Sequence, residues 1–191
     1  MRTSINNNIK NLFAVIASLV IVIPGESLSN TLTTIELGKA HIPQFMIGLV
    51  SSSFYAGLTI GAFIIEPFIV RVGHIRAFST FASLLSALYI CQGFYLDEWT
   101  WIIIRFFIGY CTSGIFIVIE SWLLASSDRS NRGMILSIYM IATYLAQAVG
   151  QLFLAIDIPQ SIFLFCISSL LASVSIVPLA MSRVTHPQIE K

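Results

Sequence analysis

The stretch WTWIIIRFFIGYCTSGIFIVIESWLL, residues 99–124, decides the fold class of this chain. Its residues are apolar, or small and uncharged, apart from Arg105 near one end and Glu120 near the other. A bilayer core of about 30 Å is crossed by about 20 helical residues, because each residue rises by about 1.5 Å. The stretch is long enough and apolar enough to predict a membrane-spanning helix.

Five further apolar stretches of similar length flank this one, at residues 11–35, 44–70, 75–96, 133–156 and 160–181. Short connectors with Gly, Pro and charged residues separate them, which is the punctuation expected outside the hydrocarbon. The sequence therefore predicts an all-α membrane protein of six transmembrane helices. We expect an N-terminal segment at residues 1–10, the bundle at 11–182 and a C-terminal tail at 183–191.

The composition excludes several other classes of protein. The 191 residues are 57% hydrophobic and 10% charged, whereas soluble domains carry roughly a quarter charged residues. The net charge of +1, with no basic run, gives no reason to expect a nucleic-acid partner. The histidines lie on separate connectors and no CxxC occurs, so we expect no enzyme, metal site or cofactor, and the three cysteines are expected to be small buried residues.

The basic residues predict the orientation, because cytoplasmic loops of membrane proteins retain Lys and Arg. The loops of the opposite side contain Lys39 alone. Both termini are therefore expected in the cytoplasm, and membrane lipids are expected to surround the bundle between them. The residues assigned to the cytoplasmic side are Arg2, Lys10, Arg71, Arg76, Arg129, Arg132, Arg183 and Lys191.

Two charged residues inside the spans suggest a functional pair, since a charge in hydrocarbon is costly unless it is paired or hydrated. Glu26 and Arg105 lie at similar depth, so we expect them to meet and line a cavity. Pro24-Gly25 beside them can break a helix, which is tolerated only where the backbone faces protein or a water-filled cavity. Glu26 is the candidate proton carrier, with Arg105 tuning its proton affinity. The alternative is a permanent structural ion pair.

Other polar and small residues form three further predicted sets. Cavity-facing hydrogen-bonding residues are Asn30, Gln147 and Gln151. A predicted cytoplasmic charge network contains Glu66, Arg71, Arg76, Glu120, Arg129 and Arg132. Within it, Glu120 is expected to contact Arg132 or the 71–76 loop. The alternative for Glu66 is that its side chain reaches the membrane interface on its own. Small residues that allow close helix packing are Ser53, Gly57, Gly61, Gly109 and Gly150.

The order of these features resembles the amino-terminal half of the major facilitator superfamily, from about residue 11 to residue 183. Arg105-Phe106-Phe107-Ile108-Gly109 matches the family's Arg-x-x-x-Gly in the fourth helix. Residues 70–76, VRVGHIR, match its basic loop after the second helix. In this sequence Val70 stands in place of the family's Asp, and Glu66 stands in place of the Gly that precedes it. Residues 120–122 and 130–133, ESW and SNRG, resemble a bacterial subgroup of mostly uncharacterised, efflux-like members. Residues 148–151, AVGQ, replace the Gly-Pro signature of drug/proton antiporters.

The resemblance implies a 3+3 inverted repeat that forms half of a transporter, with the first and fourth helices facing a central cavity and the third and sixth peripheral. It implies a secondary active transporter of a small solute across the bacterial inner membrane, with proton-coupled efflux as one form. Because family members bind their solute between two halves, we expect a second six-helix half or a homodimer partner. The alternative is a non-transporting membrane scaffold or a truncated remnant of a transporter.

Overall fold

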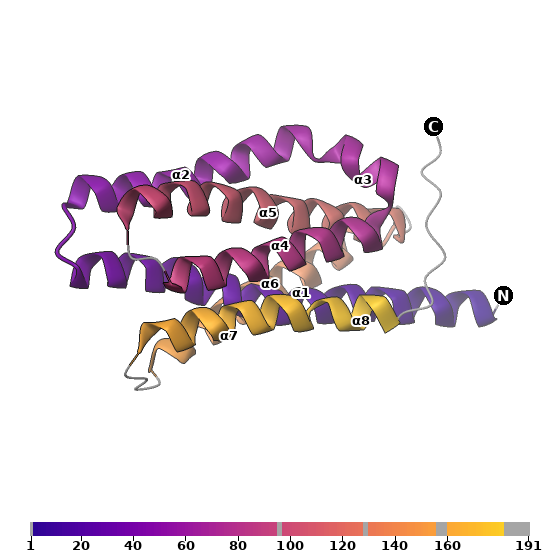
Figure 1. Ribbon diagram of the computed structural model, residues 1–191. Coiled ribbons are helices and arrows are strands. Elements are labelled where there is room, and N and C mark those ends of the chain that lie inside the picture. The colour runs from indigo at the N-terminus through magenta and orange to yellow at the C-terminus, as the bar shows by residue number, and fades with distance from the viewer. Residues whose placement is uncertain (1, 95–96, 128–129, 156–159, 182–191) are drawn as a thin grey trace.

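The computed structural model describes residues 2–94, 97–127, 130–155 and 160–181, and within those ranges every regular element is helical (Figure 1). Burial is described from residue 12 onward. The elements are α1 (Arg2–Lys39), α2 (Gln44–Ile64), α3 (Glu66–Val72), α4 (His74–Phe94), α5 (Glu98–Ala125), α6 (Arg132–Leu152), the 3-10 turn η1 (Phe153–Ala155), α7 (Ser161–Val174) and α8 (Ile176–Met181).

Six of the described helical segments are long and apolar enough to cross a membrane, which confirms the predicted number of spans. They have 21 to 28 residues each, in keeping with the thickness of a bilayer core. The chain is therefore a multi-pass membrane protein. The segments are Leu12–Lys39, Gln44–Ile64, His74–Phe94, Glu98–Ala125, Arg132–Ala155 and Ser161–Met181.

Prolines interrupt two of these helices where a continuous helix was expected. The second predicted span divides at Ile65 into α2 and α3, and the sixth divides at Ser175 into α7 and α8. Pro67 and Pro178 follow these points within a few residues. A proline lacks the N–H that would bond the carbonyl four residues earlier, so the helix bends just before it.

Pro24-Gly25 does not break the first helix, because α1 runs without interruption from Arg2 to Lys39. Neighbouring helices pack closely on both residues. A Cβ on Gly150 of α6 would lie 2.4 Å from the Pro24 carbonyl oxygen, and one on Gly25 would lie 2.9 Å from the Ser168 carbonyl oxygen of α7. Prolines are tolerated inside membrane helices when neighbouring helices support the local backbone.

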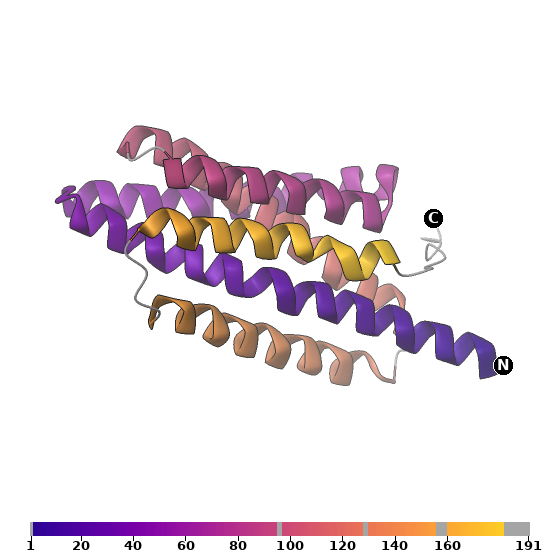
Figure 2. The same ribbon diagram turned by 60° about the horizontal axis from the view of Figure 1, so that its bottom comes forward.

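The packing of the helices repeats between the two halves of the chain. The most extensive helix pairs are α2 with α5, α1 with α6, α4 with α7, α4 with α5, and α1 with α7 (Figures 1 and 2). The first three spans, α1, α2 and α4, correspond in order to the last three, α5, α6 and α7. Under this correspondence the pair α2–α5 matches α1–α6, and the pair α4–α5 matches α1–α7. This correspondence is the pairing expected of a 3+3 inverted repeat within half of a major facilitator fold.

Glycines set the closest approach between α2 and α5. A Cβ on Gly57 would lie 1.9 Å from the Phe106 carbonyl oxygen, and one on Gly109 would lie 2.0 Å from the Phe54 carbonyl oxygen. Each glycine thus faces the backbone of the opposite helix. Gly61 approaches Ser113 in the same interface. Ser53 differs from this set, because its hydroxyl donates within α2 to the Val50 carbonyl at 2.7 Å.

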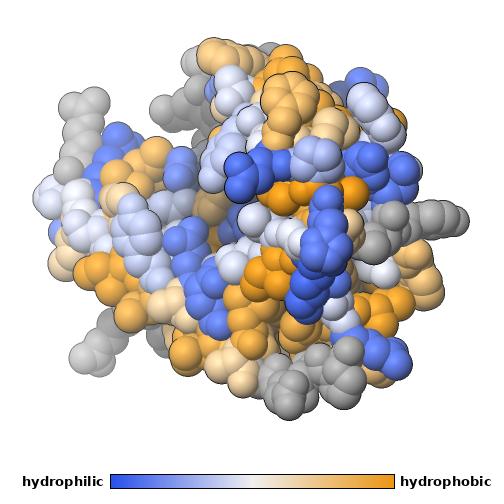
Figure 3. Space-filling model, turned by 90° about the vertical axis from the view of Figure 1, so that its left-hand side faces the viewer, coloured by the Kyte–Doolittle hydropathy of each residue, from blue (hydrophilic) through white to orange (hydrophobic). Residues whose placement is uncertain are grey.

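Burial places α1 and α5 at the centre of the bundle. In the most apolar 18 residues of each span, 67% of the residues are buried in α1 and 61% in α5, against 22% to 39% in the other spans. Figure 3 views the end where α1 finishes and α2 begins, with hydrophilic residues near its middle and hydrophobic residues along much of its edge. Cys111 on α5 is buried, whereas Cys91 and Cys166 are exposed on outer faces of α4 and α7, contrary to the expectation for all three.

Candidate functional site

Three polar side chains meet inside the bundle, and Asn30 stands between the two charged ones. Asn30 lies one turn after Glu26 on α1, and its amide Nδ2 donates to Glu26 Oε1. Arg105 of α5 donates from Nη2 to the Asn30 carbonyl oxygen Oδ1. The side chains of Glu26 and Arg105 are 7% and 3% exposed. The two predicted partners are therefore joined through an amide that donates to the acid and accepts from the base.

Arg105 has bonding capacity that this arrangement leaves unused. Its Cζ lies 4.7 Å from the centroid of the Phe54 ring, a cation–π distance. Its Nε and Nη1 groups are buried without a hydrogen-bond partner in the described part of the chain. The expected direct ion pair with Glu26 is not formed, because the Asn30 amide occupies the space between the two charges.

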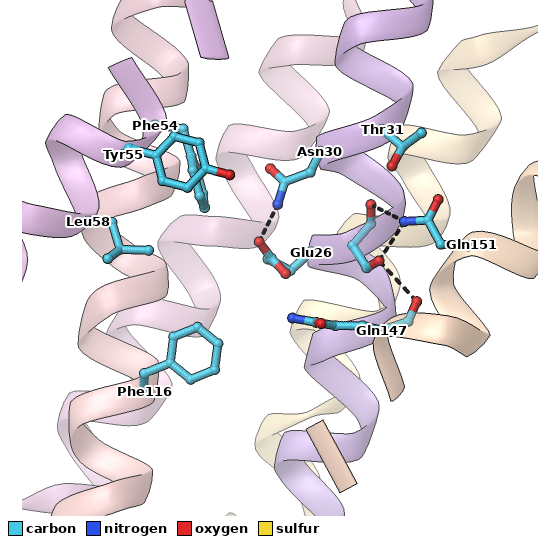
Figure 4. A pocket seen from close by; sticks show the side chains of 10 residues that line it. Glu26, Asn30, Thr31, Phe54, Tyr55, Leu58, Phe116, Gln147 and Gln151 are labelled. Atoms are coloured by element: carbon cyan, nitrogen blue, oxygen red, sulfur yellow. Dashed lines mark hydrogen bonds between the residues drawn. The ribbon is translucent and has the colours of Figure 1, made fainter. Parts of the chain in front are cut away.

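A cavity of about 270 Å³ opens beside Glu26 and Asn30 (Figure 4). The Asn30 amide and the Glu26 carboxylate point toward one another, with the apolar side chains of Phe54, Leu58 and Phe116 across from them. The cavity thus lies between a polar wall and an apolar wall. Its lining residues are Glu26, Ser27, Asn30, Thr31, Phe54, Tyr55, Leu58, Phe116, Gln147 and Gln151.

Both predicted glutamines line this cavity, and Ser27 connects α1 to their helix. Ser27 Oγ donates to the Gln147 carbonyl at 3.0 Å, and Gln151 Nε2 donates to Ser27 Oγ at 2.7 Å (Figure 4). The Gln151 amide is therefore tied to α1, while the Gln147 side chain faces the cavity. Sequence reasoning missed Ser27, because its contacts depend on how α6 packs beside α1 and adjacent residues of a helix do not share a face.

A second cavity of about 550 Å³ lies between α5 and α6 and shares Phe116 and Gln147 with the first. Tyr139 donates its hydroxyl to Glu120 Oε1 there at 2.9 Å. The first cavity is lined by residues of α1, α2, α5 and α6 and the second by residues of α5 and α6. No described residue of the third or sixth span lines either cavity, as expected if these two spans are peripheral. Those of the second cavity are Phe116, Glu120, Leu124, Leu136, Tyr139, Met140, Thr143, Tyr144 and Gln147.

The predicted contact of Glu120 with Arg132 or with the 71–76 loop is not present among the described side chains. Glu120 turns toward α6 and bonds Tyr139, and the ion pair found in the described ranges joins Lys39 to Glu36 at 2.9 Å. The other described members of that set, Glu66, Arg71, Arg76 and Arg132, form no ion pair with one another, and Arg129 lies outside the described residues.

His74 is not on a connector, as the sequence suggested, but begins α4 and is buried. Its ring nitrogen Nε2 lies 3.1 Å from the Ser121 hydroxyl, and its ring packs 5.6 Å from that of Trp122. Gly73, with φ of 86°, makes the preceding turn and lets α4 start at this residue. These contacts join α4 to the end of α5 where the charge network was expected.

The sequence of this chain is similar to those of known membrane transport proteins. The family described as Major Facilitator Superfamily matches residues 12–191. An uncharacterised MFS-type transporter of Yersinia enterocolitica is 33% identical over 159 residues, which cover 82% of this chain and 41% of the relative. An uncharacterised MFS-type transporter, YcaD, of Salmonella enteritidis is 29% identical over 161 residues, covering 84% and 42%. The chain thus spans less than half the length of these curated relatives.

Proposed function

The chain belongs to the major facilitator superfamily, and from that premise we propose that it is a six-helix half of a secondary active transporter for a small solute. The observation that carries this proposal is the Glu26–Asn30–Arg105 set at a cavity inside an apolar bundle. Burying a carboxylate and a guanidinium costs several kcal/mol per ion, and well-packed apolar residues often replace such groups without loss of stability. A bundle with a purely structural role has little use for them.

Glu26 is the proposed proton carrier, and Asn30 makes its coupling to Arg105 switchable. Rotation of the Asn30 side chain out of its bridging position would leave the Glu26 carboxylate and the Arg105 guanidinium free to pair directly. An ionised Glu26 favours this direct pair, whereas a protonated Glu26 has no charge to pair and favours the Asn30 bridge. The bound proton thereby selects the geometry of the contact between α1 and α5.

The cavities indicate the side on which the rest of the transporter would pack. The first is lined by residues of α1, α2, α5 and α6, and the second by residues of α5 and α6. This side of the bundle is therefore the proposed boundary with a second six-helix half or a homodimer partner. Members of such folds transport by rocking one half against the other around a site at the boundary. We place the assembly in the bacterial inner membrane with both chain ends cytoplasmic, and efflux is the proposed direction.

A solute-driven proton flux tests this function. The chain, with any partner that copurifies, is reconstituted into liposomes that contain a pH-sensitive dye and is challenged with neutral, anionic and cationic solutes. We expect at least one solute to move protons and Glu26→Gln to abolish that movement. Glu36→Gln is the matched control, because Glu36 pairs with Lys39 at the end of α1 away from the cavity.

The scaffold alternative gives a different result in the same experiment. It predicts that no solute moves protons through the wild-type protein and that Glu26→Gln lowers only the folded yield. Either absence of flux in the wild type, or flux that Glu26→Gln leaves unchanged, would contradict the proposed coupling.

A further inference from the structure

The two adjoining cavities carry acidic and aromatic groups, and none of their lining residues is basic. We propose that they bind an organic cation with apolar or aromatic substituents, and that Glu120 is its principal charged contact. This inference names the solute class and therefore rests on the proposed function. The class of solute follows from three properties: the negative charge of the lining residues, the open second oxygen of the Glu120 carboxylate, and the aromatic rings around that carboxylate.

The charge of the lining residues favours a cation. Glu26 contributes to one cavity and Glu120 to the other. The nearby cation, Arg105, is 3% exposed, lies against Phe54 and donates to Asn30, so its charge is held behind the cavity wall. An anionic solute would face carboxylates without a compensating partner, which is costly away from water.

Glu120 has the geometry of a ligand contact. Its side chain is exposed toward the cavity, and Tyr139 bonds one of its oxygens, Oε1, at 2.9 Å. That hydrogen bond orients the carboxylate, and no described residue occupies Oε2. A carboxylate fixed by one donor and open at its second oxygen is suited to pairing with a positively charged group.

The surroundings of Glu120 favour an organic cation over a metal ion. Phe116, Tyr139 and Tyr144 line the same cavity, and aromatic faces attract cations within about 6 Å of the ring centroid. The volume of about 550 Å³ lies within the range of about 300–1,000 Å³ that small-molecule sites occupy. Within the described ranges no group of three His, Cys, Asp or Glu side chains could hold a metal ion.

Two probes of the same shape and opposite charge test this inference in the full chain. Binding of tetraphenylphosphonium and of tetraphenylborate is measured on the purified protein in lipid nanodiscs by equilibrium dialysis. We expect saturable binding of the phosphonium alone. Glu120→Gln is expected to weaken it by about tenfold or more, the loss of a charge-assisted contact. Glu36→Gln, at the far end of α1, should leave the affinity unchanged.

Tyr144→Leu provides an independent variant, because it removes a ring from the cavity and leaves the carboxylate in place. We expect about a threefold or greater loss of phosphonium affinity from the lost cation–π contact. Equal binding of the two probes, no saturable phosphonium binding, or unchanged affinity in folded Glu120→Gln protein would overturn the inference. Proton flux driven by another solute without phosphonium binding would also overturn it and leave the proposed function standing. Phosphonium binding without any solute-driven flux would contradict the proposed function alone.

Discussion

Replacing Gly57 with Ala tests the packing that holds α2 against α5. The new Cβ would lie 1.9 Å from the Phe106 carbonyl oxygen, whereas ordinary van der Waals contact begins near 3.4 Å. The helices would have to separate by about 1.5 Å, because a backbone carbonyl within a helix cannot rotate away. Overpacking of this kind costs about 1–3 kcal/mol or more. The intrinsic helix preference of Ala over Gly, about 1 kcal/mol, acts in the opposite direction.

Gly48→Ala is the matched control on the same helix, since a Cβ there has no neighbouring atom within 4 Å. We expect Gly48→Ala to maintain or raise the unfolding free energy and Gly57→Ala to lower it by up to about 2 kcal/mol after the helix-preference gain is included. Unfolding in mixed detergent micelles, followed by tryptophan fluorescence, measures both variants. A Gly57→Ala protein as stable as Gly48→Ala would refute the close crossing of α2 and α5.

Three further predictions concern a buried hydrogen bond, the acid dependence of stability and the orientation in the membrane. Thr33→Val should lower the unfolding free energy by about 1–3 kcal/mol, because it leaves the buried Gln92 amide, now donating to Thr33 Oγ1 at 2.8 Å, without its acceptor. The Thr100 hydroxyl and backbone N–H donate to the Asp97 carboxylate and lower its pKa below the ordinary value of 3.8. These hydrogen bonds therefore stabilise the folded protein above about pH 3.8, and the stabilisation is lost as pH falls through the folded-state pKa. Asp97→Asn should remove this acid-dependent part of the unfolding midpoint. Lys39→Cys should react with an impermeant maleimide added from the periplasmic side, and labelling only from the cytoplasm would contradict the proposed orientation.

Hydropathy was sufficient to predict the six spans, because the length of an apolar run maps directly onto bilayer thickness. Proline was a poorer guide to their continuity. The helices bend before Pro67 and Pro178 but continue through Pro24, where α6 and α7 pack closely on Pro24 and Gly25. Whether a proline interrupts a helix depends on neighbouring helices, and a single sequence does not specify those neighbours.

The site was predicted to the level of its residues but not of its contacts. Their similar depth predicted that Glu26 and Arg105 approach one another, and the structure brings both to Asn30. The spacing of Asn30, four residues after Glu26, was a readable signal for a contact on one helix face. The turn of Glu120 toward Tyr139 had no such signal, because it depends on how α6 packs beside α5.

In the proposed mechanism a proton on Glu26 selects between the Asn30 bridge and a direct contact with Arg105. Solid-state nuclear magnetic resonance of lipid-embedded protein, with isotopically labelled Glu carboxyl carbons and Arg side-chain nitrogens, follows both groups as pH changes. Glu26→Gln and Arg105→Lys assign the two signals. We expect the Glu26 and Arg105 signals to shift with one common midpoint. An Arg105 signal that stays constant while Glu26 titrates would contradict this mechanism.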